Sequence, residues 1–237
     1  MTEQLLTDLA TTSATESSVQ AARSPGGDDE WWRDAVIYQV YVRSFADANG
    51  DGTGDLAGVR SRLPYLRDLG VDAMWFTPWY ASPMADGGYD VADYRAIDPA
   101  FGTLGEAEAL IREALELGIR TIIDVVPNHV SDQHPWFQAA LAAGPGSPER
   151  ARFWFRPGRG QSGEDMPTTW PSNFSGSTWT RTTDPDGSPG EWYLHLFSAH
   201  QPDLNWNHPD VGTSRSDPCP GARSRLRGFA CRRTSRR

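Results

Sequence analysis

The sequence predicts an α/β fold in which parallel strands alternate with helices. Three segments rich in β-branched and aromatic residues predict buried strands, at 35–44, 71–77 and 120–126. Apolar residues recur at helical spacing between these segments, which predicts helices over 56–69 and 106–117. This alternation requires a parallel sheet with right-handed crossovers, either an open doubly wound sheet or a (β/α)8 barrel. Composition does not separate the two.

Local signals support these elements. The helix over 106–117 follows Thr103-Leu-Gly-Glu106, which matches a capping box, because the Thr hydroxyl and the Glu carboxylate can each accept a backbone N–H of the first turn. No Gly-x-Gly-x-x-Gly turn follows the first strand. This disfavours the dinucleotide-binding version of the doubly wound sheet.

The residues after Val126 predict an inserted, irregular subdomain over 130–211. About eighty residues rich in Pro, Gly, Ser, Trp and Phe lack helical or strand periodicity, and such a length exceeds an ordinary loop. In a barrel, insertions of this kind lie at the C-terminal ends of the strands, where active sites are built. The segment Glu191-Trp-Tyr-Leu-His-Leu-Phe197 alternates like a strand, and we expect it to return the chain to the barrel.

Both ends of the chain differ from its middle in composition. Residues 1–30 are rich in Thr, Ser, Ala and Gly and predict a disordered leader. Residues 212–237 contain eight arginines against one acid, together with both cysteines, Cys219 and Cys231. Because this tail combines a sudden arginine excess, both cysteines and a lack of periodicity, we interpret it as out-of-frame translation of a GC-rich gene. The rest of the chain has no cysteine for a disulfide, a thiol nucleophile or a thiolate metal site.

Charge and hydropathy exclude two classes of partner. The net charge of −9 at pH 7 disfavours nucleic acid, because phosphate binding requires clustered cations. No segment approaches the roughly 18 to 20 apolar residues of a membrane-spanning helix, and the N-terminus lacks the pattern of a signal peptide. We therefore expect a cytoplasmic protein without a membrane partner.

The loop 47–55 predicts a structural metal site. Oxygen-bearing side chains stand at its positions 1, 3, 5 and 9, with glycine at position 6 and the carbonyl of Thr53 at position 7. The predicted ligands are Asp47, Asn49, Asp51, Thr53 and Asp55. A flexible shell of oxygens favours Ca²⁺, with Mg²⁺ as the alternative ion. The alternative interpretation is a turn-rich polar loop before a helix, because Gly58 replaces the carboxylate that ends a full EF-hand loop.

Six motifs in order carry a resemblance to a known family. They are Tyr38-Gln-Val-Tyr-Val-Arg-Ser-Phe45, the loop 47–55, Gly70-Val-Asp-Ala-Met-Trp-Phe-Thr-Pro78, Asp86-Gly-Gly-Tyr-Asp90, Asp124-Val-Val-Pro-Asn-His129 and Gln201-Pro-Asp-Leu-Asn205. Together they resemble the α-amylase superfamily of glycoside hydrolases, in its oligo-1,6-glucosidase and α-glucosidase branch. The resemblance implies the N-terminal portion of a (β/α)8 barrel, with its first three βα units over 31–129 and the inserted subdomain after the third strand.

The resemblance also implies a pocket for one terminal glucose. Asp86 resembles the carboxylate that holds the outer hydroxyls of the sugar, Tyr89 the tyrosine on which it stacks, and His129 a histidine that hydrogen-bonds it. Phe174 and Phe197 resemble apolar walls, and Gln201 a polar contact. Each assignment has a structural alternative: a turn for Asp86, a structural hydrogen bond for His129, and core packing for the two phenylalanines.

The catalytic carboxylates that the resemblance implies do not occur in this sequence. The family places an aspartate nucleophile at the end of the fourth strand in a Gly-Phe-Arg-Ile-Asp pattern, followed later by a glutamate acid and a second aspartate, whereas Gly228-Phe229 precedes Ala230-Cys-Arg-Arg. We therefore expect a truncated, inactive chain with no catalytic residue of its own. Its parent type is an α-glucosidase that cleaves terminal α-linked glucose from oligosaccharides or disaccharides by a retaining mechanism.

Two alternatives to the α-glucosidase interpretation stay open. One is a transglycosylase related to trehalose synthase or sucrose isomerase, since these relatives share the pattern of Asp86, Tyr89 and His129. The other is a non-catalytic sugar-binding fragment, which the missing carboxylates favour. The linkage preference and the oligomeric state stay undetermined by the sequence.

Overall fold

The computed structural model describes residues 30–213 and 229–233. The chain divides into a unit that ends at Ala35 and a unit that begins at Val36. In the first unit, Arg33 donates a hydrogen bond to Glu30 at 2.9 Å across a short 3-10 helix, η1 (Trp31–Arg33). The predicted disordered leader lies outside the described residues except for Glu30, and so does most of the predicted tail.

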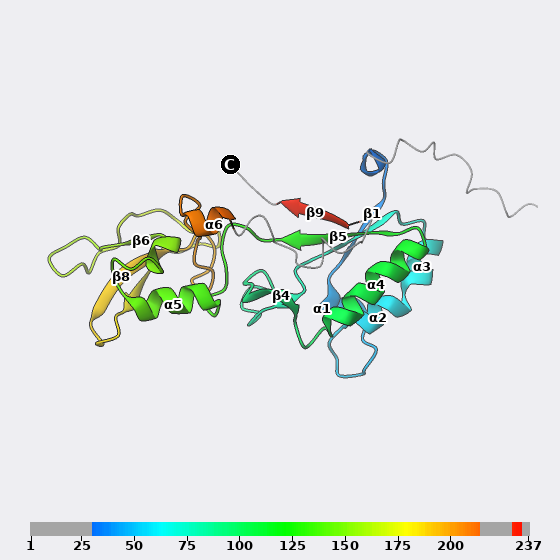
Figure 1. Ribbon diagram of the computed structural model, residues 1–237, viewed down its shortest axis with the longest axis horizontal. Coiled ribbons are helices and arrows are strands. Elements are labelled where there is room, and N and C mark those ends of the chain that lie inside the picture. The colour runs from blue at the N-terminus through cyan, green and yellow to red at the C-terminus, as the bar shows by residue number, and fades with distance from the viewer. Residues whose placement is uncertain (1–29, 214–228, 234–237) are drawn as a thin grey trace, which may run out of the picture. The chain divides into compact units, whose positions relative to one another are not determined.

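Four parallel strands form the largest sheet of the second unit, as the alternation of elements predicts. Its order is β1-β2-β5-β9, with β1 at Ile37–Val40, β2 at Ala73–Phe76, β5 at Arg120–Val125 and β9 at Phe229–Arg233 (Figure 1). Ile37 pairs with Ala73, and Ala73 pairs with Arg120, so the first three strands run side by side in register. The sheet stays open, with β1 and β9 at its edges.

The fourth strand corrects the expectation that this chain supplies only three barrel strands. β9 pairs with β5 in parallel over five residues, from Thr121 opposite Phe229 to Val125 opposite Arg233. A segment of the Arg-rich tail therefore takes the place beside β5 where a barrel's fourth strand belongs. Its sequence, Phe-Ala-Cys-Arg-Arg, contains no acid.

The helices follow the predicted apolar spacing, and one of them is divided. The periodic segment 56–69 forms two helices, α2 (Leu56–Ser61) and α3 (Leu63–Asp68). Pro64 lies in the first turn of α3, where its missing N–H costs nothing, but a continuous helix would need that donor. In contrast, α4 (Leu104–Glu116) begins with the predicted capping box, in which Thr103 and Glu106 bond each other's backbone N–H.

The first strand is shorter than the sequence predicts. It ends at Val40, and the next residues form a short helix, α1 (Val42–Phe45). The backbone N–H of Gly54 donates to the carbonyl of Arg43 at 2.7 Å, so the loop 47–55 packs directly against this turn. A Cβ atom at Gly54 would lie 2.1 Å from the carbonyl oxygen of Val42, which only glycine avoids.

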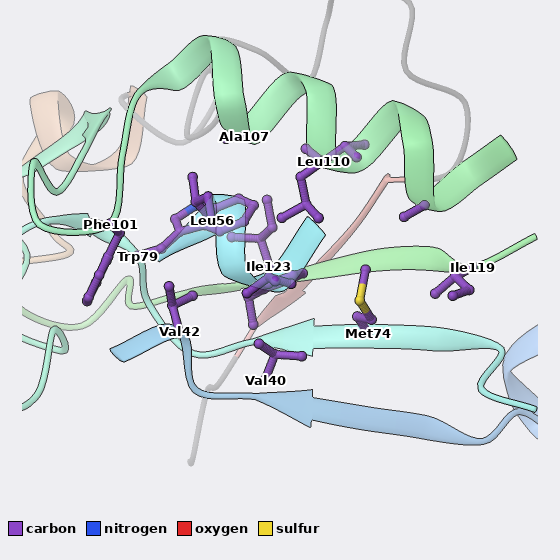
Figure 2. Close-up of a cluster of buried hydrophobic side chains, with 14 of the residues drawn as sticks. Val40, Val42, Leu56, Met74, Trp79, Phe101, Ala107, Leu110, Ile119 and Ile123 are labelled. Atoms are coloured by element: carbon purple, nitrogen blue, oxygen red, sulfur yellow. The ribbon is translucent and has the colours of Figure 1, made fainter. Parts of the chain in front are cut away.

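The apolar core of the barrel portion lies between the helices and the strands β1, β2 and β5. Leu56 and Leu110 project from α2 and α4, and Val40, Met74 and Ile123 project from the three strands (Figure 2). All five side chains are at least 96% buried. Burying a side chain of this size contributes about 1.5 to 3 kcal/mol, so this layer holds the three predicted strands in place.

The inserted segment is more regular than predicted. It contains a three-stranded antiparallel sheet of order β6-β8-β7, with β6 at Phe155–Arg156, β7 at Trp179–Thr183 and β8 at Pro189–Leu194. The expectation that residues 191–197 return to the barrel is therefore wrong for the strand itself, because β8 pairs with β6 and β7. The chain turns back only after Leu194, when Asp203 forms an isolated antiparallel bridge with His129.

Smaller elements complete the described structure. A two-stranded ribbon of β3 (Tyr80–Ala81) and β4 (Asp93–Ile97) follows β2. Helices α5 (Pro135–Ala143), η2 (Arg150–Arg152) and α6 (Pro209–Thr213) belong to the later part of the chain. A second apolar cluster contains Phe137, Phe153, Phe155, Tyr193 and Leu204. Within the described ranges, no helix combines the length and apolar character that crossing a bilayer requires.

Candidate functional site

The candidate site lies where the loops after β2 and β5 approach the end of the inserted segment. β2 and β5 are parallel neighbours, so the residues that follow Phe76 and Val125 leave the same edge of the sheet. That edge is the C-terminal one, which carries the active site in barrel enzymes. The six predicted pocket residues come from three stretches: the loop between β3 and β4, the turn after β5, and residues 172–201 of the insertion.

Asp86 and Gln201 form a hydrogen bond, with Nε2 of Gln201 2.8 Å from Oδ2 of Asp86. Gln201 is fully buried, and its own Oε1 accepts the N–H of Ser198 at 3.0 Å, which fixes the orientation of the amide. Within the described residues, no protein donor meets the second carboxylate oxygen of Asp86. Burial raises the pKa of Asp86, the nearby charge of Asp90 raises it further, and the bond from Gln201 lowers it.

Asp90 shapes the loop that presents Asp86. Its two carboxylate oxygens accept the N–H groups of Ala85 and Asp86 at 2.8 and 2.9 Å. Asp90 is completely buried, so these two N–H donors take the place of water as the hydrogen-bond partners of its carboxylate. The Asp86-Gly-Gly-Tyr-Asp90 motif is thus a closed turn whose last carboxylate fixes its first residue.

Tyr89 and His129 meet through a backbone atom. Nε2 of His129 lies 3.1 Å from the carbonyl oxygen of Tyr89, and Nδ1 lies 2.6 Å from Nδ2 of Asn128. Burial lowers the pKa of His129 to about 4, so its ring is neutral at pH 7. Because a carbonyl only accepts, Nε2 carries the proton and Nδ1 accepts from Asn128. The ring is 97% buried, although the sequence places it at an open strand end.

Aromatic side chains continue from His129 towards the surface. The rings of His129 and Phe197 have centroids 5.2 Å apart and an interplanar angle of 60°. The rings of Phe197 and Phe174 lie 5.5 Å apart at 69°, an edge-to-face contact. Phe174 is 53% exposed, so the outer end of this row of rings is accessible. Phe174 and Phe197 therefore form one wall rather than separate parts of a core.

The structure thus brings all six predicted residues into connected contacts, and it adds three that sequence reasoning missed. The hydroxyl of Tyr89 donates to Oδ2 of Asp124 at 3.3 Å; burial, together with the charge of Asp124 and this bond, raises the pKa of Tyr89 to about 12. Asp203 accepts the N–H of Leu196 at 2.5 Å, and burial raises its pKa to about 7. Asp90, Asp124 and Asp203 belong to the quoted motifs, yet only the folded chain shows which side chains they meet.

The predicted metal loop folds as a series of side-chain-capped turns. Oδ1 and Oδ2 of Asp47 accept the N–H groups of Gly50 and Gly52 at 2.7 and 2.8 Å, and these bonds lower the pKa of Asp47. Oδ1 of Asp51 accepts the N–H of Thr53 at 2.7 Å. Oδ1 of Asn49 accepts from Asp51 at 2.8 Å. The side-chain oxygens of the first half of the loop therefore bond its own backbone.

Asp55, the last residue of the loop, caps the helix that follows it. Its Oδ1 accepts the N–H of Gly58 at 2.6 Å and caps α2, while its Oδ2 accepts the N–H of Ala48 at 3.2 Å. No group of three or more His, Cys, Asp or Glu residues in the described part of the chain is arranged to hold a metal ion. The donor set nevertheless consists only of carboxylate, amide and carbonyl oxygens, which is the chemistry that Ca²⁺ prefers.

A family model and several curated proteins match the sequence of this chain. The family model described as "Alpha amylase, catalytic domain" matches residues 39–219. Oligo-1,6-glucosidase from Halalkalibacterium halodurans is 49% identical over 182 residues, which cover 77% of this chain and 31% of that protein. Trehalose-6-phosphate hydrolase from Escherichia coli is 47% identical over 80% of this chain and 33% of its own length. The chain therefore spans about a third of the curated relatives that it matches.

Solved structures give the same result for the fold. Isomaltulose synthase from Erwinia rhapontici, in a mutant form with sucrose bound, superimposes with a TM-score of 0.73 at 45% identity, over 79% of this chain and 32% of that one. Trehalulose synthase from Pseudomonas mesoacidophila superimposes with a TM-score of 0.72 at 43% identity, over 78% of this chain and 32% of its own. More than three quarters of this chain thus shares its fold with both enzymes.

Proposed function

This chain belongs to the alpha-amylase catalytic-domain family, and on that premise we propose that its site binds the terminal α-linked glucose of oligosaccharides or disaccharides. The hydrogen bond between Asp86 and Gln201 carries the proposal. It joins two of the polar groups predicted to face the sugar, and it orients a half-buried carboxylate. Apolar walls with a few oriented polar groups are typical of small-molecule sites.

Asp86 and Tyr89 are the groups that would meet the sugar first. The second carboxylate oxygen of Asp86 can accept one of its hydroxyl protons, a charge-assisted bond that contributes about 1.5 to 3 kcal/mol. Tyr89 stays protonated near neutral pH, since its pKa is raised to about 12, and its ring offers an apolar face. Gln201 acts through Asp86, because its side chain is buried behind that carboxylate.

His129 would contact the sugar only by exchanging a hydrogen bond. Both of its ring nitrogens already have protein partners, Asn128 and the carbonyl of Tyr89. A sugar hydroxyl that approaches Nε2 must therefore replace the Tyr89 carbonyl as acceptor. We infer that His129 also supports the Tyr89 loop, which is a role it fulfils without sugar.

The parent activity that we propose is retaining hydrolysis by an α-glucosidase. That mechanism needs two carboxyl groups about 5 to 5.5 Å apart, one as nucleophile and one as acid and then base. β9 lies where the family resemblance expects the nucleophile, and its residue paired with Asp124 is Arg232. A polypeptide of these 237 residues is therefore proposed to bind sugar without hydrolysing it, with no catalytic residue of its own.

A transglycosylating activity is the second candidate for the parent type. The solved structures most similar in fold include isomaltulose synthase with sucrose and trehalulose synthase. These two enzymes are named for the synthesis of isomaltulose and trehalulose, and sucrose is the natural substrate of the first. If this chain shares their preference, its pocket should select sucrose over maltose.

We also propose that the loop 47–55 binds Ca²⁺ as a structural ion, through Asp47, Asn49, Asp51, Thr53 and Asp55. The all-oxygen donor set and the two left-handed glycines, Gly50 and Gly52, support this proposal. Binding would draw the carboxylates of Asp47 and Asp51 away from some of their amide partners. The ion would stabilise the turn that packs on α1, without a part in the chemistry.

Calorimetric titration of the whole chain tests the proposed function. Maltose, isomaltose, sucrose and glucose are titrated separately, with galactose as the control that differs from glucose in the configuration of one hydroxyl. Saturable heat with a gluco-configured sugar and none with galactose is the expected result. Absence of saturable binding for every sugar contradicts the proposed site, while binding of sucrose alone favours the transglycosylase alternative.

A further inference from the structure

We infer that Ser172 is a positioning residue whose single hydroxyl holds both phenylalanines of the aromatic wall. Oγ of Ser172 donates to the carbonyl of Phe197 at 2.6 Å and accepts the N–H of Phe174 at 3.0 Å. The two rings that meet edge to face are therefore joined a second time, through their backbones. Ser172 itself is 92% buried, so it does not face the solvent from which a sugar would approach.

The turn that carries Phe174 is closed on itself around Ser172. The N–H of Ser172 donates to the carbonyl of Gly176 at 3.0 Å, and its carbonyl accepts the N–H of Ser175 at 3.2 Å. Ser175 adopts φ 79°, a left-handed conformation that costs a non-glycine residue about 1 kcal/mol or more. Such a conformation persists only where surrounding bonds hold it, and here they converge on Ser172.

A further bond connects this turn to the segment that carries Phe197. The N–H of Asn173 donates to the carbonyl of Leu196 at 2.8 Å, and the N–H of Leu196 donates to the carboxylate of Asp203 at 2.5 Å. Asp203 in turn bridges His129 through its backbone. A continuous series of backbone and side-chain bonds thus connects Ser172 to His129, in addition to the edge-to-face contacts of the rings.

The consequence for binding rests on the proposed sugar site. Phe174 stays 53% exposed while its backbone is fixed, so its ring is ready for a ligand before the ligand arrives. A preorganised group loses less conformational entropy on binding than a mobile one. Ser172 would therefore set the affinity for sugar without touching it.

Hydrogen exchange and NMR of the whole chain test this role. In the wild-type chain the amide of Phe174 should exchange slowly, and the two phenylalanine rings should show a mutual nuclear Overhauser effect. Ser172→Ala should speed exchange of the Phe174 amide by about tenfold, the effect of one net hydrogen bond, and weaken the contact between the rings. Ser172→Thr keeps the hydroxyl and should retain both signals.

Ser177→Ala is the matched control. Its hydroxyl accepts the N–H of Trp179 at 2.9 Å and lies within donating distance of the carbonyl of Trp179 at 3.0 Å and of Sδ of Met166 at 2.8 Å, so its partners differ from those of Ser172. The inference is overturned if Ser172→Ala leaves the Phe174 amide unchanged, or if Ser177→Ala disturbs it equally. Should Ser172→Ala not fold, fast exchange of this amide in the wild-type chain overturns the inference by itself.

The sugar measurement separates this inference from the proposed function. If maltose binds the wild-type chain, Ser172→Ala should raise its Kd by about two- to tenfold, and Ser177→Ala should leave it unchanged. An unchanged Kd in Ser172→Ala overturns the role in binding. If no sugar binds the wild-type chain, the proposed function fails, while the exchange experiment still decides whether Ser172 holds the two rings.

Discussion

His129 and Asp203 pair through their backbones in an isolated antiparallel bridge, and burial shifts both side chains towards their neutral forms. The pKa of His129 falls to about 4, whereas that of Asp203 rises to about 7. The end of the inserted segment thus meets the turn after β5 at two groups that resist carrying charge. Near neutral pH, we therefore expect Asp203 to change its charge, whereas His129 stays neutral.

The first prediction concerns Asp203 and stability. Its folded-state pKa of about 7 lies above its ordinary value of 3.8, so the folded chain holds this proton more tightly than the unfolded chain. The stabilisation is therefore complete below pH 3.8 and is lost as pH rises to about 7, at roughly 1.4 kcal/mol per unit of pKa difference. Asp203→Asn cannot ionise, and its side-chain carbonyl can still accept from Leu196.

Urea unfolding at several pH values measures this effect. At pH 8, Asp203→Asn should be more stable than the wild type by at least about 1.4 kcal/mol, the equivalent of one pKa unit. That advantage should diminish steadily towards pH 4. Identical pH profiles for the two proteins would show that Asp203 titrates at its ordinary pKa.

The second prediction concerns Asp86 and sugar affinity. Asp86→Ala removes the carboxylate that Gln201 orients and should weaken the binding of maltose or sucrose by about 10- to 100-fold. Asp68→Ala serves as the control, because Asp68 is exposed and forms an ion pair with the neighbouring Arg67 at 2.8 Å. Equal affinity of both variants, measured by calorimetric titration, contradicts the placement of the sugar.

The third prediction concerns the loop 47–55 and calcium. Ca²⁺ should raise the Tm of the wild-type chain, because an ion that binds only the folded state stabilises it, by about 2.7 kcal/mol at one hundred times its Kd. Asp51→Ala should abolish this response to Ca²⁺ and to chelator, while Asp68→Ala should keep it. A wild-type Tm that is independent of Ca²⁺ would favour the alternative of a turn-rich loop.

The fourth prediction concerns Arg150, which is buried in the inserted subdomain. Its guanidinium bonds Asp184 at 2.8 Å and Glu191 at 2.9 Å, and it lies 4.7 Å from the centroid of the Phe155 ring. Arg150→Ala leaves two carboxylates without their cation and should lower the free energy of unfolding by about 3 to 5 kcal/mol. Arg67→Ala, which breaks an exposed pair, should have little effect in the same urea titration.

The fifth prediction concerns catalysis by the 237-residue chain. Release of p-nitrophenol from p-nitrophenyl α-glucoside should not exceed the uncatalysed rate, because under the proposed function the chain lacks both the nucleophile that would form the glycosyl intermediate and the paired acid that would protonate the leaving oxygen. Asp124 is not a substitute, since it lies within β5 and accepts from Tyr89. Clear turnover that co-purifies with this chain would mean that its catalytic carboxylates lie among residues assigned other roles.

The sequence by itself determined the elements whose signals are local. The strands β1, β2 and β5 and the helix α4 follow from apolar patterns of a few residues, and the Thr103–Glu106 capping box needs only residues three positions apart. The ordered motifs also identified the family, from which the six candidate pocket residues were predicted. These patterns predict structure without knowledge of the rest of the fold, because backbone propensity and capping act within one or two turns.

Only the tertiary structure decided which distant segments pair. The alternating pattern of Glu191–Phe197 shows a strand but not its partners, and these proved to be β6 and β7. The bond of Gln201 to Asp86 and the burial of His129 likewise depend on where the insertion returns. Pairing across a hundred residues is selected by packing and by the burial of polar groups with their partners, which no short window of sequence contains.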